Sequence, residues 1–269
     1  MRWTERQRRM LEAMGVHLLE PRAAAASDTV VVDAPAAAAV PREATPAPAP
    51  APASASASAP RGARAAEVVV PADVAAMDWS ALRSAVSGCR ACGLCESRTQ
   101  TVFGVGNEHA QLMIVGEAPG EQEDLQGEPF VGQAGKLLDN MLRAIGLTRS
   151  AGPPGQEARQ VFIANTLKCR PPRNRNPEPA ETARCAPYLV RQIELVRPRA
   201  LLAMGRFAAQ SLLASDEPIG KLRGRVHRWR DIPVVVTYHP AYLLRTLADK
   251  ARAWDDLCLT AALLEGERP

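Results

Sequence analysis

The chain has 269 residues, enough for one or two domains, but Pro, Ala and Ser concentrate near the N-terminus and shorten the part that can fold, so we expect one compact domain. No stretch is apolar over the length of a membrane span, and the first residues lack the charged-then-apolar pattern of a signal peptide, so we expect a cytoplasmic protein with no membrane contact. The sequence pI of about 8.9 is consistent with a polyanionic partner.

Three segments are expected along the chain. Residues 1–20 place apolar side chains on one helical face and predict a short amphipathic helix, which either packs on its own domain or binds a protein partner. Residues 21–75 are rich in Ala, Pro and Ser and lack an apolar period, so they predict a disordered linker. Residues 76–269 then form the folded domain.

Four short aliphatic runs in that domain predict buried strands: 112–116, 161–165, 200–205 and 232–240. Helical patterns stand between them at 132–147, 179–196 and 206–214. Alternation of strands and helices is typical of parallel sheets with helices on both faces. We therefore expect an α/β fold, a three-layer α/β/α sandwich with a central four-stranded, mainly parallel sheet.

Polar residues follow the ends of these strands, where open parallel sheets bind ligands. The first strand leads into "GEAPGEQED" (116–124), whose glycines allow a ligand to approach the backbone; a tight turn with acidic capping residues is the alternative. Asn165 ends the second strand and could offer a donor and an acceptor to a nucleobase, or could be a turn residue. His239 follows the fourth strand and should point into the crevice.

Six cysteines raise a separate question. "CRACGLC" places Cys89, Cys92 and Cys95 at two-residue spacings, and Cys169 and Cys185 follow later. A reducing compartment disfavours disulfides, so metal binding or redox chemistry is favoured; four thiolates suit either zinc or an iron–sulfur cluster, and spacing alone does not choose. Cys258, in an apolar helical pattern, is expected to be buried and unligated.

A basic stretch at residues 221–230 interleaves Lys and Arg with Trp229. It predicts a hairpin or extended loop with one cationic face, suited to a phosphate backbone, although most charge runs are merely solvated.

Four motifs together resemble the family-4 uracil-DNA glycosylases, the iron–sulfur-containing branch of the uracil-DNA glycosylase superfamily. They are "CRACGLCESRTQTVFGVGN", "LMIVGEAPGEQEDLQGEPFVGQAGKLLD", "FIANTLKCRPPRNRNPEP" and "HPAYLLR", within roughly residues 85–262. The resemblance implies a monofunctional hydrolase that flips uracil out of single- or double-stranded DNA and leaves an abasic site. A non-catalytic DNA-binding module of the same fold and a redox protein are the alternatives, and we expect a monomer.

The resemblance also implies roles for residues in the crevice. Phe130 should stack on uracil and Asn165 should read its Watson–Crick edge, while His239 stabilises the charge that develops on a uracil carbonyl. Glu117 would position or activate water, and Gly116 is expected to lie against the substrate.

Two further positions in the first motif are assigned to substrate binding. Ala118 stands where the best-studied branch of the superfamily has an aspartate, so a strong general base at 118 is not expected. Glu123 stands where a family member excludes the thymine methyl group.

DNA contacts are implied for two loops. Leu243 or Leu244 should wedge into the base stack, with Arg245 holding phosphate or base; inward packing of the leucines is the alternative. Arg170, Arg173 and Arg175 lie in the other loop. This loop keeps "KCRPPRNRNPEP" where a related, covalently bonding branch carries an insertion with histidine, so the hydrolytic branch is favoured.

The cofactor implied by the resemblance is a structural [4Fe-4S] cluster. Its ligands would be Cys89, Cys92, Cys169 and Cys185, with Cys95 at a non-ligand position.

Overall fold

The computed structural model describes residues 73–151 and 155–266. The helix predicted for residues 1–20 and most of the linker predicted for 21–75 lie outside these residues. The last linker positions are described, and there η1 (Val74–Ala76) buries Val74 in the hydrophobic core, so the folded domain already includes Val74.

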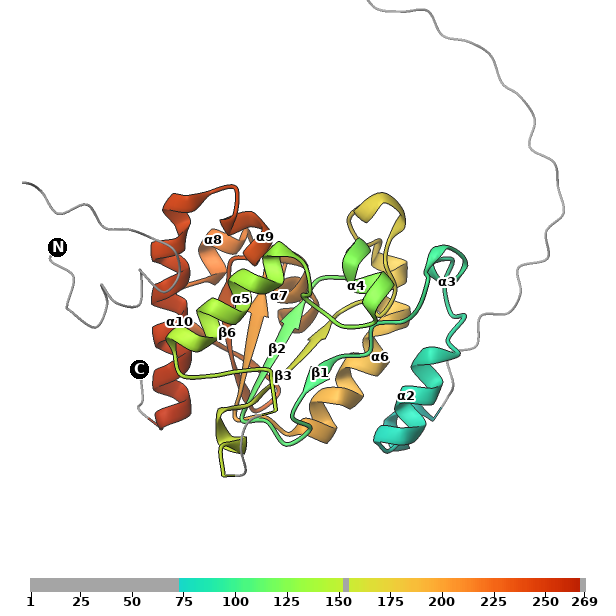
Figure 1. Cartoon of the computed structure of the whole chain (residues 1–269), viewed down its shortest axis with the longest axis horizontal. Helices are drawn as coiled ribbons and strands as arrows, with labels where there is room; N and C mark the ends of the chain where they lie inside the picture. Colours follow the sequence, from blue (N-terminus) through green and yellow to red (C-terminus); the bar gives the residue numbers. More distant parts are fainter. Residues whose placement is uncertain (1–72, 152–154, 267–269) are drawn as a thin grey trace, which may run out of the picture. The chain divides into compact units, whose positions relative to one another are not determined.

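A six-stranded sheet forms the centre of the domain, in the order β1-β3-β2-β4-β6-β5 (Figure 1). The predicted strands are β2 (Leu112–Gly116), β3 (Val161–Asn165), β4 (Ala200–Met204) and β6 (Ile232–Thr237), and all their mutual pairings are parallel. The first three are buried along their whole length, as expected of continuous aliphatic runs between two helical layers.

The predicted number of four strands was wrong, because two short edge strands flank the parallel core. They are β1 (Val105–Gly106), antiparallel to β3, and β5 (Val226–Trp229), antiparallel to β6. β1 is only two residues long and contains Gly106, and β5 is partly exposed and basic, so neither shows the aliphatic pattern of a buried strand. The predicted α/β class and parallel core are confirmed.

Helices cover both faces of the sheet. One face packs against α2 (Trp79–Ser87), α6 (Pro179–Val196), α7 (Arg206–Leu213) and α8 (Ile219–Leu222). The other packs against α5 (Gln133–Ala144), α9 (Pro240–Leu243) and α10 (Lys250–Glu265). The shorter helices are α3 (Leu94–Ser97), α4 (Glu121–Gln126), η2 (Glu157–Arg159), η3 (Pro172–Asn174) and η4 (Leu247–Asp249).

Local sequence explains where several helices begin. Asp78 accepts a hydrogen bond from Ala81 N at 2.8 Å and caps α2. Pro179 occupies the first turn of α6, where its missing N–H costs nothing, and Glu178 with Glu181 forms a capping box there. The helix expected from 179–196 therefore has the predicted bounds.

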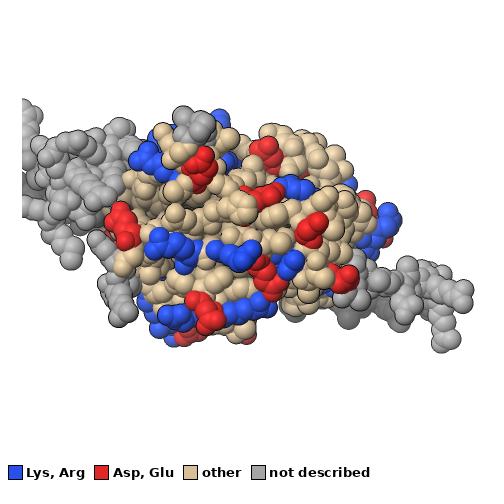
Figure 2. All heavy atoms as spheres, turned by 90° about the horizontal axis from the view of Figure 1, so that it is seen from below, with Lys and Arg blue, Asp and Glu red and all other residues tan. Residues whose placement is uncertain are grey.

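The basic stretch at 221–230 covers the end of α8, the following turn, β5 and the start of the β5–β6 turn, and three of its arginines form ion pairs: Arg223, Arg225 and Arg230. Arg223 and Asp256 form a buried ion pair, and Arg230 bonds Glu194 at 2.7 Å. The β5–β6 turn lies at the amino end of β6, away from the carboxyl ends of the parallel strands. Figure 2 shows the molecule from below, and basic and acidic residues are interspersed on this face.

The order of the strands determines where a site can form. The chain passes from β2 to β3 on one side and then to β4 on the other side of β2, so the connections diverge next to β2. Open α/β sheets bind ligands outside the carboxyl ends of strands at such a point. Among the described residues, no helix is long and apolar enough to span a membrane.

Candidate functional site

A cleft of about 760 Å³ opens at the carboxyl ends of the parallel strands. Its volume lies in the range of sites for small organic ligands. It brings together eight of the residues predicted from the sequence: Glu117, Ala118, Glu123, Phe130, Asn165, Arg175, His239 and Arg245.

Asn165 is the last residue of β3, and its side chain is 2% exposed. Its Oδ1 is buried and has no hydrogen-bond partner among the described residues. An unpaired buried acceptor costs free energy, so its presence in a cleft points to a ligand that donates a hydrogen bond. Gly116, at the end of β2, makes room for it: a Cβ there would collide with Asn165 Oδ1 and lie 2.7 Å from the Phe130 ring.

Phe130 is held in a strained backbone conformation. Its φ of 57° lies in the left-handed region, which non-glycine residues rarely adopt. Gly135 allows this turn, because a Cβ at 135 would overlap the Phe130 carbonyl. Arg149 holds the preceding carbonyl of Pro129 at 2.7 Å. The fold thus fixes the ring beside His239, with the two ring centroids 5.4 Å apart and the planes 28° from parallel.

His239 is fixed as a neutral hydrogen-bond donor. Its Nδ1 accepts the backbone N–H of Ala241 at 3.2 Å at the start of α9, so in the neutral ring the proton lies on Nε2. Burial lowers the pKa of His239 to about 4; the charge of Glu123 opposes this shift and Arg245 adds to it. The imidazole therefore stays neutral at physiological pH.

Glu117 follows β2 and lines the same cleft as Arg206. Burial raises the pKa of the Glu117 carboxyl, and the positive charge of Arg206 partly offsets the shift. A carboxylate with a raised pKa is a better proton acceptor than an ordinary surface glutamate. Ala118 beside it brings only a methyl group to the cleft wall.

Glu123 ties together the loops around the cleft. Its carboxylate accepts three backbone N–H groups: Gly120 at 3.0 Å, Val131 at 2.9 Å and Gly132 at 3.3 Å. These bonds join the start of α4 to the residues that follow Phe130. Glu123 lines the cleft as predicted, and its hydrogen bonds add the task of holding the Phe130 loop.

Leu243, the last residue of α9, and Leu244, which follows it, have different environments. Leu243 is fully buried in the core between the sheet and α5, so its predicted contact with DNA does not fit the structure. Leu244 is 43% exposed, and Arg245 beside it is exposed and lines the cleft. Helical geometry explains the difference, because consecutive residues point in different directions and only one can face the core.

The arginines of the 170–175 loop are engaged to different degrees. Arg175 forms a bidentate ion pair with Glu181, at 2.6 and 2.9 Å, so its guanidinium is largely occupied by a partner within the protein. Arg170 donates to Asn174 Oδ1 at 2.7 Å and lies 3.6 Å from Glu121. Arg173 is exposed and, within the described part of the chain, forms no ion pair.

Several cleft residues were not predicted. Gly205 follows β4, Arg206 and Phe207 are the first two residues of α7, and Tyr238 and Tyr242 stand on either side of His239 in the sequence. The run "MGRFAA" after a predicted strand was a usable signal, since it stands at the carboxyl end of β4 like the others. The tyrosines are ordinary core residues by sequence, and only their place beside His239 brings them to the wall.

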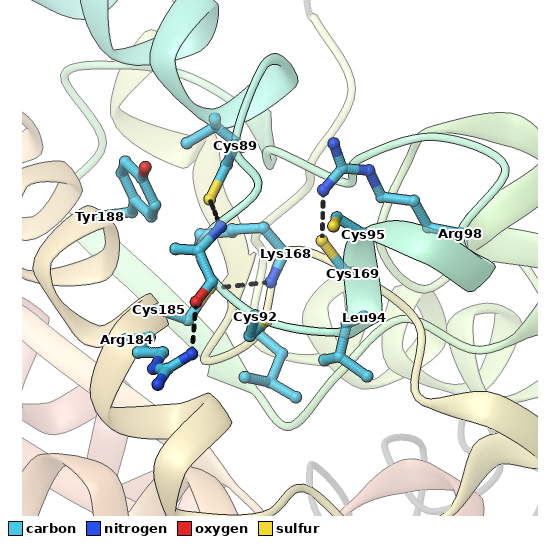
Figure 3. A pocket seen from close by; sticks show the side chains of 13 residues that line it. Cys89, Cys92, Leu94, Cys95, Arg98, Lys168, Cys169, Arg184, Cys185 and Tyr188 are labelled. Atoms are coloured by element: carbon cyan, nitrogen blue, oxygen red, sulfur yellow. Dashed lines mark hydrogen bonds between the residues drawn. The ribbon is translucent and has the colours of Figure 1, made fainter. Parts of the chain in front are cut away.

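A second pocket lies beside the start of the domain and is lined by five cysteines: Cys89, Cys92, Cys95, Cys169 and Cys185 (Figure 3). Apolar residues such as Val86, Leu94 and Leu167 complete its wall. None of the cysteines is in a disulfide. Burial raises the pKa of the Cys185 thiol to about 12, so ionised thiolates here need compensating positive charge.

Hydrogen-bond donors point at these sulfur atoms. Arg98 Nη1 donates to Cys169 Sγ at 3.1 Å, Lys168 N to Cys185 Sγ at 3.3 Å and Ala91 N to Cys89 Sγ at 3.5 Å (Figure 3). The buried hydroxyl of Tyr188 lines the same pocket without a partner of ordinary geometry among the described residues. N–H and O–H donors around thiolates are typical of iron–sulfur sites.

The donor set therefore fits a thiolate-ligated group. No three His, Cys, Asp or Glu side chains in the described ranges converge closely enough to hold a single metal ion; the thiols instead surround a shared pocket. Cys95 lines this pocket with the predicted ligands, so the geometry does not set it apart. Cys258, predicted to be buried, is exposed on α10; the apolar helical pattern gave the wrong side for this residue.

Comparison with known proteins identifies the family of the chain. Residues 103–258 match the family model of the uracil DNA glycosylase superfamily. A type-4 uracil-DNA glycosylase of Archaeoglobus fulgidus is 47% identical over 59% of this chain and 79% of the relative. Those of Saccharolobus solfataricus and Thermotoga maritima are 45% and 41% identical, over 74% and 83% of their lengths and 59% and 62% of this chain.

Proposed function

The chain belongs to the uracil-DNA glycosylase superfamily and excises uracil from DNA, and we propose that the cleft at the carboxyl ends of β2, β3, β4 and β6 is where it does so. The reaction is hydrolysis of the N-glycosidic bond, which leaves an abasic site. Because that bond is unreachable inside a duplex, the nucleotide must leave the base stack and enter the cleft. The observation that carries the proposal is the buried Oδ1 of Asn165, which has no partner among the described residues, in the same cleft as a neutral His239.

Recognition of the base follows from the chemistry of the cleft. The N3–H group of uracil can donate the hydrogen bond that Asn165 Oδ1 does not receive from the described residues. The amide NH₂ of Asn165 can donate to the uracil carbonyl next to N3. The Phe130 ring offers a stacking surface beside it. Cytosine has an unprotonated ring nitrogen at the same position, so it would leave Asn165 Oδ1 unpaired, and a buried polar group left unpaired rejects the wrong base.

His239 would stabilise the leaving group. As the glycosidic bond breaks, electrons move onto the base and negative charge develops on its carbonyl oxygen. Nε2–H of the neutral imidazole can donate to that oxygen, and because Nδ1 is held by Ala241 N–H the ring need not reorganise during the reaction.

Water would attack the anomeric carbon of the sugar under the guidance of Glu117. Ionised Glu117, with its raised pKa, can orient the water and accept its proton. Ala118 supplies no carboxylate, so no second base is assigned to this wall of the cleft.

DNA would be held around the rim of the cleft. Leu244 is the residue that can fill the space left by the flipped nucleotide, since it is exposed where Leu243 is buried. Arg245 and Arg173 are exposed cations suited to phosphate, whereas Arg170 and Arg175 would mainly shape their loop through Asn174 and Glu181.

We assign Cys89, Cys92, Cys169 and Cys185 as ligands of a structural [4Fe-4S] cluster. When bound, the group would cross-link the start of the domain to the loop that carries Arg170, Arg173 and Arg175. Support comes from the thiol-lined pocket and from the donors aimed at its sulfur atoms.

We also propose that the folded domain, predicted as residues 76–269 and extended by η1 (Val74–Ala76), carries the activity as a monomer in the cytoplasm. The segment at residues 1–20 would serve a protein partner.

The test is excision by the full chain, purified without oxygen. A strand with a single uracil, alone and in a duplex, should release free uracil and break at that position after alkali, and a thymine strand should not. Asn165→Ala is the control for the site. Absence of breaks with wild-type protein would contradict the proposal, and equal cleavage by Asn165→Ala would move the chemistry out of this cleft.

A further inference from the structure

Lys168 is a fully buried charged residue that the proposed mechanism does not use. Its side chain is 2% exposed, and it follows β3 between Asn165 and Cys169. Lysines are rarely buried to this extent unless their charge is compensated, because desolvating an ammonium is costly. Among residues 73–151 and 155–266, Lys168 forms no ion pair with a carboxylate.

Thiolates of the cysteine pocket would supply the compensation when they hold an iron–sulfur core. Lys168 lines that pocket together with Cys169 and Cys185 (Figure 3). Its backbone N–H donates to Cys185 Sγ at 3.3 Å. Four thiolates around an iron–sulfur core carry net negative charge, so an ammonium at this place is electrostatically favoured.

The Lys168 ammonium also contacts the backbone of a residue that lines the cleft. Nζ donates to the main-chain oxygen of Asn165 at 2.8 Å. A second bond, to Gln192 Oε1 on α6 at 2.6 Å, anchors it, and Gln192 Nε2 in turn donates to Phe103 O at 2.9 Å. Lys168 is thus fastened to α6 and holds the carbonyl of the residue that reads the base.

The segment that Lys168 braces is also hydrogen-bonded to the backbone of Gly116, at the end of β2, and of Glu117 beyond it. Beyond the end of β3, Thr166 N donates to Gly116 O at 3.0 Å and Leu167 N to Glu117 O at 3.1 Å. The same short stretch therefore links the backbone that follows Asn165 to the end of β2.

We propose that Lys168 is a positioning residue that couples the cysteine pocket to uracil recognition, by fixing the carbonyl of Asn165 from within the charged surroundings of the thiols. This inference rests on the proposed role of Asn165. It gives the cysteine pocket a defined effect on the cleft, through one side chain.

The experiment compares Lys168→Met with the wild type in the anaerobically purified full chain. Met has similar length without charge or donors. Because a hydrogen bond from a charged group is lost, we expect kcat/KM to fall about tenfold and binding of free uracil, measured by calorimetry, to weaken by a similar factor. Lys168→Arg should restore part of both. In iron-loaded protein the reduction potential should become more negative, since a positive charge is removed.

A double-mutant cycle separates positioning from mere stability. If Lys168 acts through Asn165, then Lys168→Met added to Asn165→Ala should cost no further activity. Additive losses, or wild-type uracil binding by Lys168→Met, would overturn the proposal. Wild-type activity of Asn165→Ala alone would instead refute the proposed role of Asn165, so the two failures are distinguishable.

Gln192→Met provides a second variant should Lys168→Met not fold. It removes the anchor on α6, keeps the lysine and matches the shape of Gln. We expect a several-fold loss of kcat/KM that is again absent in the Asn165→Ala background. A loss of the same size in both backgrounds would contradict the coupling.

Discussion

The two pockets of the domain differ in whether their polar groups already have hydrogen-bond partners. In the cleft, Asn165 Oδ1 is buried without a partner in the described part of the chain, and Nε2 of His239 is left to donate. In the cysteine pocket, the sulfur atoms already receive N–H groups from Arg98, Lys168 and Ala91. A site for a ligand that comes and goes must keep its polar groups available, whereas a site for a permanent group can surround it with fixed donors.

The comparison predicts that changes at the cysteines act on stability and changes in the cleft act on the reaction. The largest effect is expected for Cys92→Ser. Loss of a ligand should remove the iron and lower Tm by roughly 10 °C or more, because a cross-link between distant segments is lost. Iron content and calorimetry measure this.

Cys95→Ser is the matched control, since Cys95 lines the same pocket but is not assigned as a ligand. It should keep the iron and the Tm of the wild type. Loss of iron from Cys95→Ser together with retention by Cys92→Ser would reverse the ligand assignment.

Glu117→Gln should sharpen the comparison from the side of the cleft. We expect kcat to fall about 100-fold at neutral pH with iron content unchanged. In the wild type, kcat should fall as the pH drops through the raised pKa of Glu117, since the ionised form guides water. The decline should disappear in Glu117→Gln; a variant that keeps it would exclude Glu117 as its source. Protonation of His239 does not contribute to the decline in kcat until the pH falls to about 4.

The same substitution should affect stability in the opposite sense. A carboxyl whose pKa is raised in the folded state destabilises the fold where it is ionised. This cost is absent below the pKa of the carboxyl in the unfolded chain, grows as the pH rises from that value to the folded-state pKa, and is complete above it. Glu117→Gln should therefore show a small increase in Tm at neutral pH that vanishes in acid.

Gly116→Ala tests the fit of the cleft. The new Cβ would lie 2.7 Å from the Phe130 ring and collide with Asn165 Oδ1, so we expect about a thirtyfold loss of kcat/KM, as for other steric changes that misplace a reacting group. Gly220→Ala on α8, where a Cβ meets nothing within 4 Å, is the control and should behave as wild type. Equal effects of the two would show that the space at Gly116 is unimportant.

The smallest effect is expected for Leu244→Ala, about tenfold on duplex DNA and less on single strands, because only a duplex must be unstacked. Leu243→Ala should instead cost about 2–5 kcal/mol of stability, as buried leucines do. Thermal melts and excision rates measured on both variants separate the two roles. A large loss of excision without destabilisation in Leu243→Ala would reverse the assignment.

Sequence patterns predicted the parts of the fold that depend on continuous burial. The runs at 112–116 and 161–165 became β2 and β3 with the expected bounds. β1 was missed because it is only two residues long, and β5 was predicted only as part of a hairpin or extended loop because it is polar. Cys258 was misplaced because a weakly amphipathic helix does not fix which residues face inward.

The candidate site was predictable where a residue ends a strand, as Asn165 does, or lies just beyond one, as His239 does. Its supporting interactions were not. The left-handed backbone of Phe130, the three N–H groups on Glu123 and the bond from Lys168 to the Asn165 carbonyl depend on segments that meet only in the folded chain. The sequence motifs contain the reacting groups, but they do not show which contacts hold those groups in place.

The most direct test of the central claim, that chemistry belongs to the cleft and not to the cysteine pocket, is the single-turnover excision rate of His239→Ala with its iron content measured on the same sample. We predict a rate lower by about 100- to 1,000-fold, as for other lost oxyanion donors, with iron equal to the wild type. A wild-type rate at full iron content would contradict the account.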